Sequence, residues 1–337
     1  MNRSELVKTL ELIKPALATN NVVPIFQCYV FGMGTVEAYD DQIAICGPCD
    51  IEEDFAIHGN TLLGLLSNSK AEEVSFSFKD DTATLTMGKS VSRLPYQPKE
   101  NFIFNAPTLD VRKGIPFTES LANALNLCLE TVSKDTTQPA LLGVTLCGSN
   151  LYSCNGDALT RVAIKQAVKG RVLLPTAFCE AVLKLWSSLE MTKGTLCFDS
   201  EWVFADFGDW HVYGRVLEIP DPIDFDNEVK KTVKGKVPLL AVPSGFGDAL
   251  RRARVLAEPE SQRTVVTVEK GRLRLLTETH MGEVKDELPL KGHPDVVAHV
   301  NAAHIQQAIS HCEQFAILDN CTVFEAPDVF MLVSNMG

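Results

Sequence analysis

The chain has 337 residues, of which 45% are hydrophobic and 22% are charged, and its formal net charge is −12 at pH 7. This length suits two or three domains, and the composition is typical of a soluble globular protein. The negative charge excludes a surface that is basic all over, but it still allows DNA binding by one positively charged face.

Membrane and secretory segments are not expected. No apolar run reaches the roughly 18 to 20 residues that cross a membrane, and the first residues, Met1–Glu5, do not lead into a signal-peptide core. The sequence therefore predicts a cytoplasmic protein. The 10 cysteines are scattered one at a time through apolar segments, so reduced core thiols are expected rather than disulfides.

The first third begins with an amphipathic helix from Ser4 to Leu17, which Ser4 is expected to cap and Pro15 is expected to end early. Its apolar residues recur at i, i+4, i+7 and i+11 and form one stripe. A β-rich run, a second helix and a meander of short alternating strands follow. Their ranges are Val22–Phe31, Gln42–Cys46, Asn60–Ser67, Val74–Phe78, Ala83–Met87 and Val91–Leu94.

The middle third repeats this order. Its helices are expected at Thr118–Val132 and Thr176–Ser188. Between them, Asn155-Gly156 is a tight-turn signal, because both residues tolerate positive φ. Apolar runs flank this turn and predict half-buried strands, and more strands follow the second helix. The predicted strands are Leu141–Leu146, Leu159–Ile164, Thr195–Phe198, Trp202–Phe207 and His211–Leu217.

The last third repeats the order again. Its first helix starts near Phe246 and carries the same stripe spacing, and its second helix is expected at Asn301–His311. Three strands should end the chain, at Phe315–Leu318, Thr322–Phe324 and Val329–Val333. Two segments without a clear apolar period, Pro107–Ile115 and Asp226–Lys236, are expected to be linkers.

The spacing of these elements indicates a repeat. Leu121 lies 115 residues after Leu6, and Phe246 lies 125 residues after Leu121. The predicted starts of the second helices, Asn60, Thr176 and Asn301, are separated by 116 and 125 residues. Since the two sets of offsets agree, we expect an α+β fold of three tandem domains, 1–112, 113–232 and 233–337, each with two helices on antiparallel sheet.

Short segments in the same order resemble the bacterial sliding clamp, the β subunit of the replicative DNA polymerase holoenzyme. Each segment alone is weak evidence, but the segments occur in the family's order and spacing along essentially the whole chain. The segments are Val23-Pro24-Ile25, Leu142-Gly143-Val144, Asn155-Gly156-Asp157-Ala158-Leu159, Val172-Leu173-Leu174-Pro175, Ile219-Pro220-Asp221 and Val329-Phe330-Met331-Leu332-Val333.

This resemblance implies a ring of two chains paired head to tail, with helices lining the hole and sheets forming the outer wall. Such a clamp slides on duplex DNA as a processivity factor, tethers the replicative polymerase and is placed by a clamp loader. It is no enzyme, and no cofactor, metal or catalytic residue is expected. The implied location is cytoplasmic and nucleoid-associated, with no membrane contact.

Basic residues on the expected lumen helices are the candidates for DNA contact. They would bind phosphates without sequence preference, which suits a ring that slides. An ordinary solvated helix face is the alternative for each of them. The DNA-facing candidates are Lys8, Lys14, Lys184, Arg251 and Arg252, whereas Arg254 lies beside the expected subunit contact.

Two further sites follow from the resemblance. Peptide segments of polymerases and the loader should dock on the central turn and the terminal strand, at Leu141, Gly156, Asp157, Leu159, Met331 and Val333. The dimer contact should join Phe102 of one chain to Val255 and Leu256 of the other.

The peptide site departs from the family pattern. The family turn usually reads Thr-Asp-Gly-His-Arg-Leu, and this turn, Cys154–Leu159, lacks both the imidazole and the guanidinium. We therefore expect peptides with a basic residue beside an apolar anchor. The divergence suits a virus-encoded clamp that serves its own polymerase.

Two rival functions fit parts of the sequence. The first is a monomeric clamp-fold scaffold for protein interaction, without a DNA ring. The second is a thiol oxidoreductase that uses Cys46-Gly47-Pro48-Cys49, although the acidic residues after this motif would raise a thiol pKa. His304 and His311 can share one helix face, where phosphate contact is favoured over a metal-ligand pair.

Overall fold

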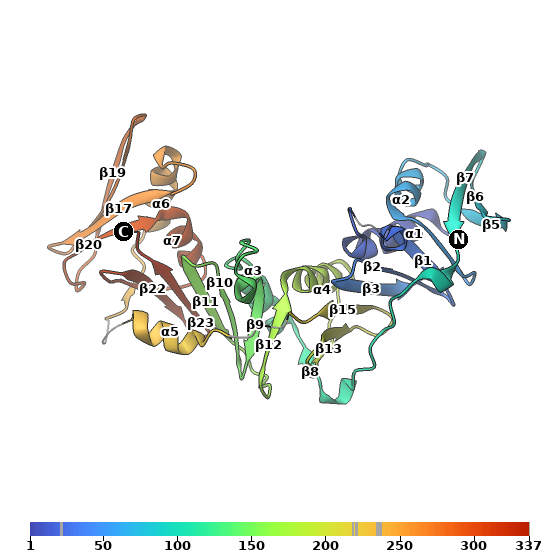
Figure 1. Ribbon diagram of the computed structural model, residues 1–337. Coiled ribbons are helices and arrows are strands. Elements are labelled where there is room, and N and C mark those ends of the chain that lie inside the picture. The colour runs from blue at the N-terminus through green and yellow to red at the C-terminus, as the bar shows by residue number, and fades with distance from the viewer. Residues whose placement is uncertain (21–22, 218, 220–221, 234–237, 337) are drawn as a thin grey trace. The chain divides into compact units, whose positions relative to one another are not determined.

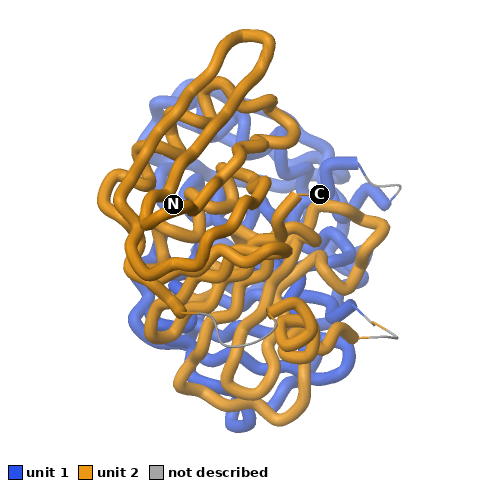
Figure 2. The backbone as a smooth tube through the Cα atoms, turned by 90° about the vertical axis from the view of Figure 1, so that its left-hand side faces the viewer, with its two compact units in different colours: residues 1–123, 172–218 blue, residues 124–171, 219–337 orange. Residues whose placement is uncertain are grey.

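The computed structural model describes residues 1–20, 23–217, 219, 222–233 and 238–336. The chain forms two compact units, residues 1–123 with 172–218 (unit 1) and residues 124–171 with 219–337 (unit 2), which are coloured separately in Figure 2. Half of the predicted middle domain lies in each unit. The division into three tandem domains stays a prediction.

Among the described residues, unit 1 contains α1 (Arg3–Ile13), α2 (Gly59–Ser67), α4 (Thr176–Ser188) and the first residues of α3 (Glu119–Leu129). The cap of α1 is Asn2, whose side-chain oxygen accepts hydrogen bonds from the backbone N–H groups of Ser4 at 2.8 Å and Glu5 at 3.2 Å. The prediction that Ser4 caps this helix is wrong by two residues. The early end at Pro15 is confirmed, because α1 gives way there to a 3₁₀ turn, Lys14–Ala16.

Unit 1 contains an 11-stranded antiparallel sheet in the order β5-β6-β7-β4-β1-β2-β3-β15-β14-β13-β8. The expected strand Val22–Phe31 is only partly strand, since Pro24–Gln27 forms a 3₁₀ turn and Val22 lies outside the described residues. The strand bounds are β1 (Cys28–Gly32), β2 (Thr35–Tyr39), β3 (Ile43–Pro48), β4 (Phe55–His58), β5 (Ser75–Lys79), β6 (Thr82–Met87), β7 (Ser90–Gln97), β8 (Ile115–Phe117), β13 (Gly194–Phe198), β14 (Trp202–Asp206) and β15 (His211–Arg215).

Unit 2 contains a second antiparallel sheet, which includes strands in the order β9-β10-β11-β23-β22-β21-β16, and a 4-stranded sheet in the order β19-β18-β17-β20. The strand β12 (Arg171–Pro175) leads into α4. The remaining bounds are β9 (Gly143–Cys147), β10 (Asn150–Cys154), β11 (Ala158–Ala163), β16 (Leu240–Ala241), β17 (Arg263–Glu269), β18 (Arg272–Thr279), β19 (Gly282–Pro289), β20 (Val296–Asn301), β21 (Gln314–Ile317), β22 (Cys321–Ala326) and β23 (Val329–Ser334).

Helices cover both faces of the β9–β16 sheet of unit 2 (Figure 1). On one face, here called the inner face, α6 (Phe246–Leu256) and α7 (Ala302–Ile309) enclose a core that includes Phe246, Ile305, Phe315, Phe324, Met331 and Val333. The opposite, outer face carries a second cluster that includes Tyr152, Leu159, Phe225, Phe330 and Leu332. The helix α3 (Glu119–Leu129) precedes this sheet in the chain.

A helix lies where a linker was expected, and it covers the outer face. The segment Asp226–Lys236 was expected to be a linker, but α5 spans Phe225–Thr232, and residues 234–236 lie outside the described part of the chain. Asp224 caps α5 by accepting a hydrogen bond from the N–H of Asn227 at 3.1 Å. Phe225 and Val229 are one helical turn apart and both face the sheet.

The other expected linker, Pro107–Ile115, has no regular structure before a 3₁₀ turn at Val111–Lys113 and then enters β8. The α+β class, with helices packed on antiparallel sheets, is confirmed. Within the described residues, every helix is too short or too polar to pass through a lipid bilayer.

Candidate functional site

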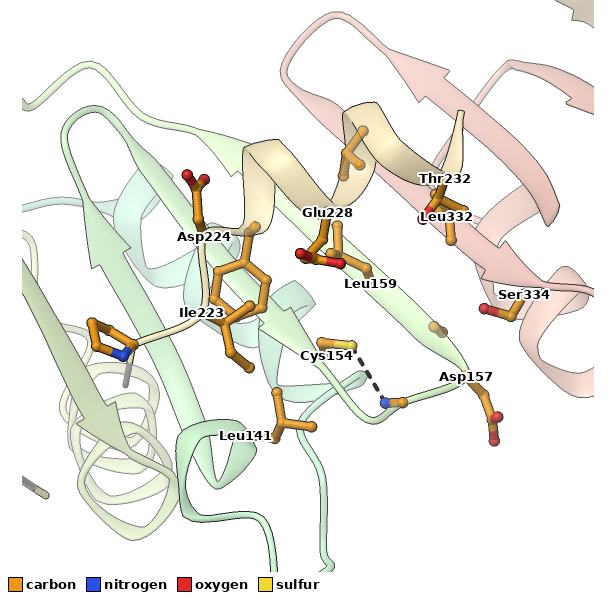
Figure 3. Close-up of a pocket in the computed structure, with 15 residues that line it drawn as sticks. Leu141, Cys154, Asp157, Leu159, Ile223, Asp224, Glu228, Thr232, Leu332 and Ser334 are labelled. Atoms are coloured by element: carbon orange, nitrogen blue, oxygen red, sulfur yellow. Dashed lines mark hydrogen bonds between the residues drawn. The ribbon is translucent and has the colours of Figure 1, made fainter. Parts of the chain in front are cut away.

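A cavity of about 530 Å³ lies on the outer face of the unit 2 sheet, beneath α5 (Figure 3). Its floor includes Leu159 of β11 and Leu332 of β23, and Leu141 adds apolar surface at one end. Ile223 and Phe225 contribute the wall on the side of α5. Polar groups lie around these apolar residues at Asp157, Asp224, Glu228, Thr232 and Ser334.

The terminal strand contributes different residues from those predicted. Met331 and Val333 are 1% and 0% exposed and belong to the inner core, whereas Leu332 and Ser334 line the cavity. Successive side chains of a strand point to opposite faces, and the register pairs Leu332 with Leu159. The prediction that Met331 and Val333 line the site is therefore wrong, while Leu141, Gly156, Asp157 and Leu159 do line the cavity.

The turn between β10 and β11 is held by its own side chain. Asn155 Oδ1 accepts hydrogen bonds from the N–H groups of Asp157 at 3.1 Å and Ala158 at 2.8 Å. Gly156 has φ +96°, a conformation that disfavours a side chain although a Cβ there would meet open space. The N–H of Ser334 donates to the carbonyl of Asp157 at 2.7 Å and ties the turn to β23.

A polar and aromatic network fixes α5 to the sheet. The Tyr152 ring stacks on Phe225 with centroids 5.3 Å apart and planes at 8°. The Tyr152 hydroxyl donates to Asp226 Oδ2 at 3.1 Å, and Arg161 Nη1 lies 3.5 Å from the other oxygen of this carboxylate. Burial, reinforced by Asp226, raises the pKa of Tyr152 to about 12, so the hydroxyl stays protonated and keeps donating. These contacts hold α5 in place on the sheet, so the wall that it gives to the cavity is formed without a ligand.

The cavity has an acidic character. Asp157, Asp224 and Glu228 line it, and no lysine, arginine or histidine does so among the residues that the structure describes there. Glu228 forms an ion pair with a residue outside the cavity. Lys231, on the exposed face of α5, has its Nζ 2.7 Å from the Glu228 carboxylate. The cavity therefore combines apolar surface with negative charge.

Two of the DNA-facing candidates meet in unit 1. Lys14 Nζ lies 4.0 Å from the Glu11 carboxylate, and Lys184 of α4 donates to the backbone carbonyl of Glu11. Partial burial, with a smaller contribution from Lys14, lowers the pKa of Lys184, and Glu11 opposes this shift. Lys8 is exposed on α1. Lys14, in the turn after α1, and Lys184 of α4 thus both lie near Glu11.

The candidates of unit 2 are engaged with carboxylates. Arg251 bonds to Asp248 one turn earlier on α6. Arg252 donates to both oxygens of Asp286 on β19, at 2.6 and 3.1 Å. Arg254 instead reaches Gln306 of α7 at 2.7 Å. Because Arg252 turns toward β19, it is a weaker candidate than Arg251 for contact with DNA.

The candidate dimer residues differ in exposure. Val255 is 77% exposed, whereas Leu256 and Phe102 are half-buried. The Phe102 ring packs at 6.2 Å from Phe104 within its own unit. Contact of these residues with a second chain stays a prediction.

The Cys46–Cys49 motif lacks the surroundings that thiol redox chemistry requires. Cys46 lies inside β3 and Cys49 directly follows it, and the next helix begins only at Gly59. Burial raises the pKa of each thiol to about 11, and Glu37 contributes to the shift at Cys46. Thiols of this kind stay protonated near neutral pH and are poor nucleophiles.

The two histidines of α7 and its C-terminal end do not act as a pair. His311 Nε2 lies 3.1 Å from the Glu130 carboxylate, which also accepts a hydrogen bond from Gln307 at 3.0 Å. His311 is therefore paired with a carboxylate while about a third of its side chain stays exposed, and its contact with phosphate stays a prediction. Across the described ranges, no three histidine, cysteine or carboxylate side chains gather as metal ligands.

Comparisons with known proteins bear on the fold. Neither a protein-family model nor a curated protein matches this sequence. Among solved structures, the Thermotoga maritima DNA polymerase III β subunit matches with a TM-score of 0.85 at 19% identity, over 100% of this chain and 98% of that one.

Two further solved structures agree with this match. The Caulobacter crescentus β sliding clamp gives a TM-score of 0.89 at 17% identity. The Bartonella birtlesii sliding clamp, bound to griselimycin, gives 0.89 at 16%. Both matches cover 100% of this chain and 98% of the other. The protein therefore has the fold of the bacterial β sliding clamps, at a large sequence distance from them.

Proposed function

We propose that the protein is a DNA sliding clamp. Two chains pair head to tail into a ring that encircles duplex DNA, and the ring tethers a replicative polymerase as its processivity factor. This proposal is supported above all by the structural similarity to solved clamps. The similarity covers 100% of this chain and 98% of each of those chains.

Edge strands and an exposed apolar residue support a ring. Strand β5 ends one sheet and β19 ends another, and an edge strand presents unpaired backbone groups to a partner. Val255 is a large, exposed hydrophobic residue at the end of α6. A head-to-tail contact joins two different surfaces, and in this proposal the rotation is completed by two chains, which closes the ring.

DNA is held in this proposal by phosphate contacts alone. Lys8, Lys14 and Lys184 of unit 1 carry the contact with Arg251 of unit 2, and Arg252 contributes less because Asp286 already holds it. Contacts to phosphate fix position without reading bases, which allows sliding.

The polymerase and the clamp loader dock through peptide segments at the cavity on the outer face. Its volume of about 530 Å³ is in the range of sites that hold a few side chains. Leu141, Leu159 and Leu332 supply the apolar contact.

A topological experiment tests the ring. The protein is diluted, mixed with nicked circular plasmid and concentrated so that dimers reform on the DNA, and the mixture is then washed at high salt. A clamp stays on the circle and is lost when the plasmid is linearised, because only closed topology holds it once phosphate contacts are screened. Sedimentation of the free protein should give a mass near twice 37.0 kDa. A monomer at micromolar concentration with no retention on circles would favour the interaction scaffold.

A further inference from the structure

We infer that the cavity on the outer face selects an extended peptide in which a basic side chain stands beside a large apolar one. This inference rests on the proposed docking role of the cavity and adds the chemistry of its ligand. A peptide with an acidic residue in that place binds more weakly.

The apolar part of the ligand is set by the floor. Leu159 and Leu332 are 7% and 6% exposed. The small exposed part of each side chain faces the cavity. With Leu141, Ile223 and Phe225 around them, they offer a site for one or two large aliphatic or aromatic side chains.

The charged part is set by Glu228. Figure 3 shows its carboxylate lying over the cavity near Leu159, whereas the side chains of Asp157 and Asp224 lie at the edges and point outward. No cationic side chain lines the described cavity, so the field on a bound side chain comes from carboxylates. A lysine or arginine next to the anchor meets Glu228, and an acidic residue there meets like charge.

The neighbouring lysine does not cancel this field. Lys231 lies 2.7 Å from Glu228, but the two side chains are 61% and 51% exposed. Exposed pairs of this kind contribute little net stability, so a ligand cation can replace Lys231 beside Glu228 at little cost. Asp157 and Asp224 add negative charge at either edge, and the Asp224 carboxylate is held as the cap of α5.

Backbone pairing cannot supply the selectivity. The floor strands β11 and β23 each have a strand on both sides, so no sheet edge is open to an added strand there. The turn at Asn155 uses its own N–H groups, and the N–H of Ser334 is taken by Asp157. The ligand therefore lies across side chains, and its own side chains decide its affinity.

The test uses three short fluorescein-labelled peptides that share a Leu-Phe anchor and differ at one adjacent residue, which is lysine, glutamine or glutamate. Fluorescence anisotropy measures binding to the wild type, to Glu228→Lys and to a matched control, Glu313→Lys. Glu313 is also exposed in unit 2 but lies outside the cavity. Circular dichroism melts confirm that all three proteins fold.

We expect the wild type to bind the lysine peptide about tenfold more tightly than the glutamate peptide at low salt, with glutamine between them. Glu228→Lys should reverse the order, and Glu313→Lys should keep it. Added salt should reduce the preference, because part of the pair is exposed.

The outcomes separate this inference from the proposed function. Equal binding of the three peptides, or a preference that survives in Glu228→Lys, overturns the inference and leaves the clamp proposal standing. If no peptide binds while the protein is still retained on circular DNA, the docking role of the cavity fails, and the inference fails with it. Loss of retention on circles with the charge preference intact would contradict the ring alone.

Discussion

Met331 and Leu332 are neighbours on β23 but face opposite sides of the sheet. Met331 packs into the inner core, with Phe246 and Phe324 in the same cluster, and Leu332 lies on the floor of the outer cavity. Consequently, two adjacent residues should affect two different properties of the protein.

Met331→Ala should lower the free energy of unfolding by about 2 to 5 kcal/mol, because it leaves a cavity in a packed core. The affinity of the folded protein for an anchor peptide should stay unchanged. Leu332→Ala should also cost stability, since this side chain is largely buried, but it should weaken peptide binding about tenfold. Urea titrations and peptide anisotropy separate the two effects. A folded Leu332→Ala protein with wild-type affinity would rule out the cavity as the docking site.

Tyr152→Phe should loosen α5 without unfolding the sheet, because it removes only the hydroxyl that bonds to Asp226. The expected cost is about 0.5 to 1.5 kcal/mol, seen as faster amide hydrogen exchange in α5. Tyr96→Phe is the matched control, since it removes a hydroxyl that donates to Asp80 in unit 1. Exchange in α5 that responds equally to both changes would mean that the Tyr152 network does not hold the helix.

Lys14→Ala combined with Lys184→Ala should flatten the salt dependence of DNA binding. Each lost phosphate contact removes roughly 0.9 from the slope of log K against log salt. Arg252→Ala should change the slope by less than the roughly 0.9 of one full phosphate contact, because Asp286 already engages this guanidinium. Fluorescence titrations of duplex DNA at several salt concentrations measure all three slopes. If the Arg252 variant showed the larger change, the placement of the DNA face would need revision.

Val255→Asp should weaken the dimer, because a charge would enter an apolar contact between chains. Central apolar anchors of interfaces are commonly worth about 2 kcal/mol or more, so the dissociation constant should rise at least about thirtyfold. Val297→Asp is the control, since Val297 is 60% exposed on β20 and has no predicted role in the dimer. Sedimentation equilibrium at low micromolar concentration compares the variants. Equal dissociation of both would indicate a general effect of added charge.

Cys46 and Cys49 should react slowly with iodoacetamide near neutral pH, because burial raises the pKa of both thiols from 9.0 to about 11. The folded state holds these protons more tightly than the unfolded state. Their contribution to stability is therefore fully present below pH 9 and is lost as the pH rises toward 11. Alkylation rates and urea midpoints between pH 7 and 11 test both statements. Rapid alkylation of Cys46 at pH 7 would reopen the redox interpretation.

The sequence by itself determined the local elements and their order. Stripes such as Leu6–Leu10 and Phe246–Leu250 predicted the first helices of the first and last thirds, because helical periodicity is a local property. Alternation and the Asn155-Gly156 signal located the strands around the central turn. The ordered motifs then pointed to the clamp fold, which the solved structures support along the whole chain.

The sequence also contained signals that were missed. Phe225, Val229 and Val233 recur at helical spacing, Asp224 is a good cap, and acidic residues precede Lys230 and Lys231. This pattern is short and only weakly apolar. An isolated helix of this length is marginal in water, and α5 forms because Tyr152 and its neighbours on the sheet supply the packing.

Only the tertiary structure decided which side chains share a site. Period-two alternation shows that Met331 and Leu332 face opposite ways, but it does not say which face α5 will cover. The partners of Arg252, Lys184 and His311 are distant in the sequence, so their pairing appears only when helices and strands pack together. The burial that keeps Cys46 protonated arises in the same way, from neighbours that the chain brings together on folding.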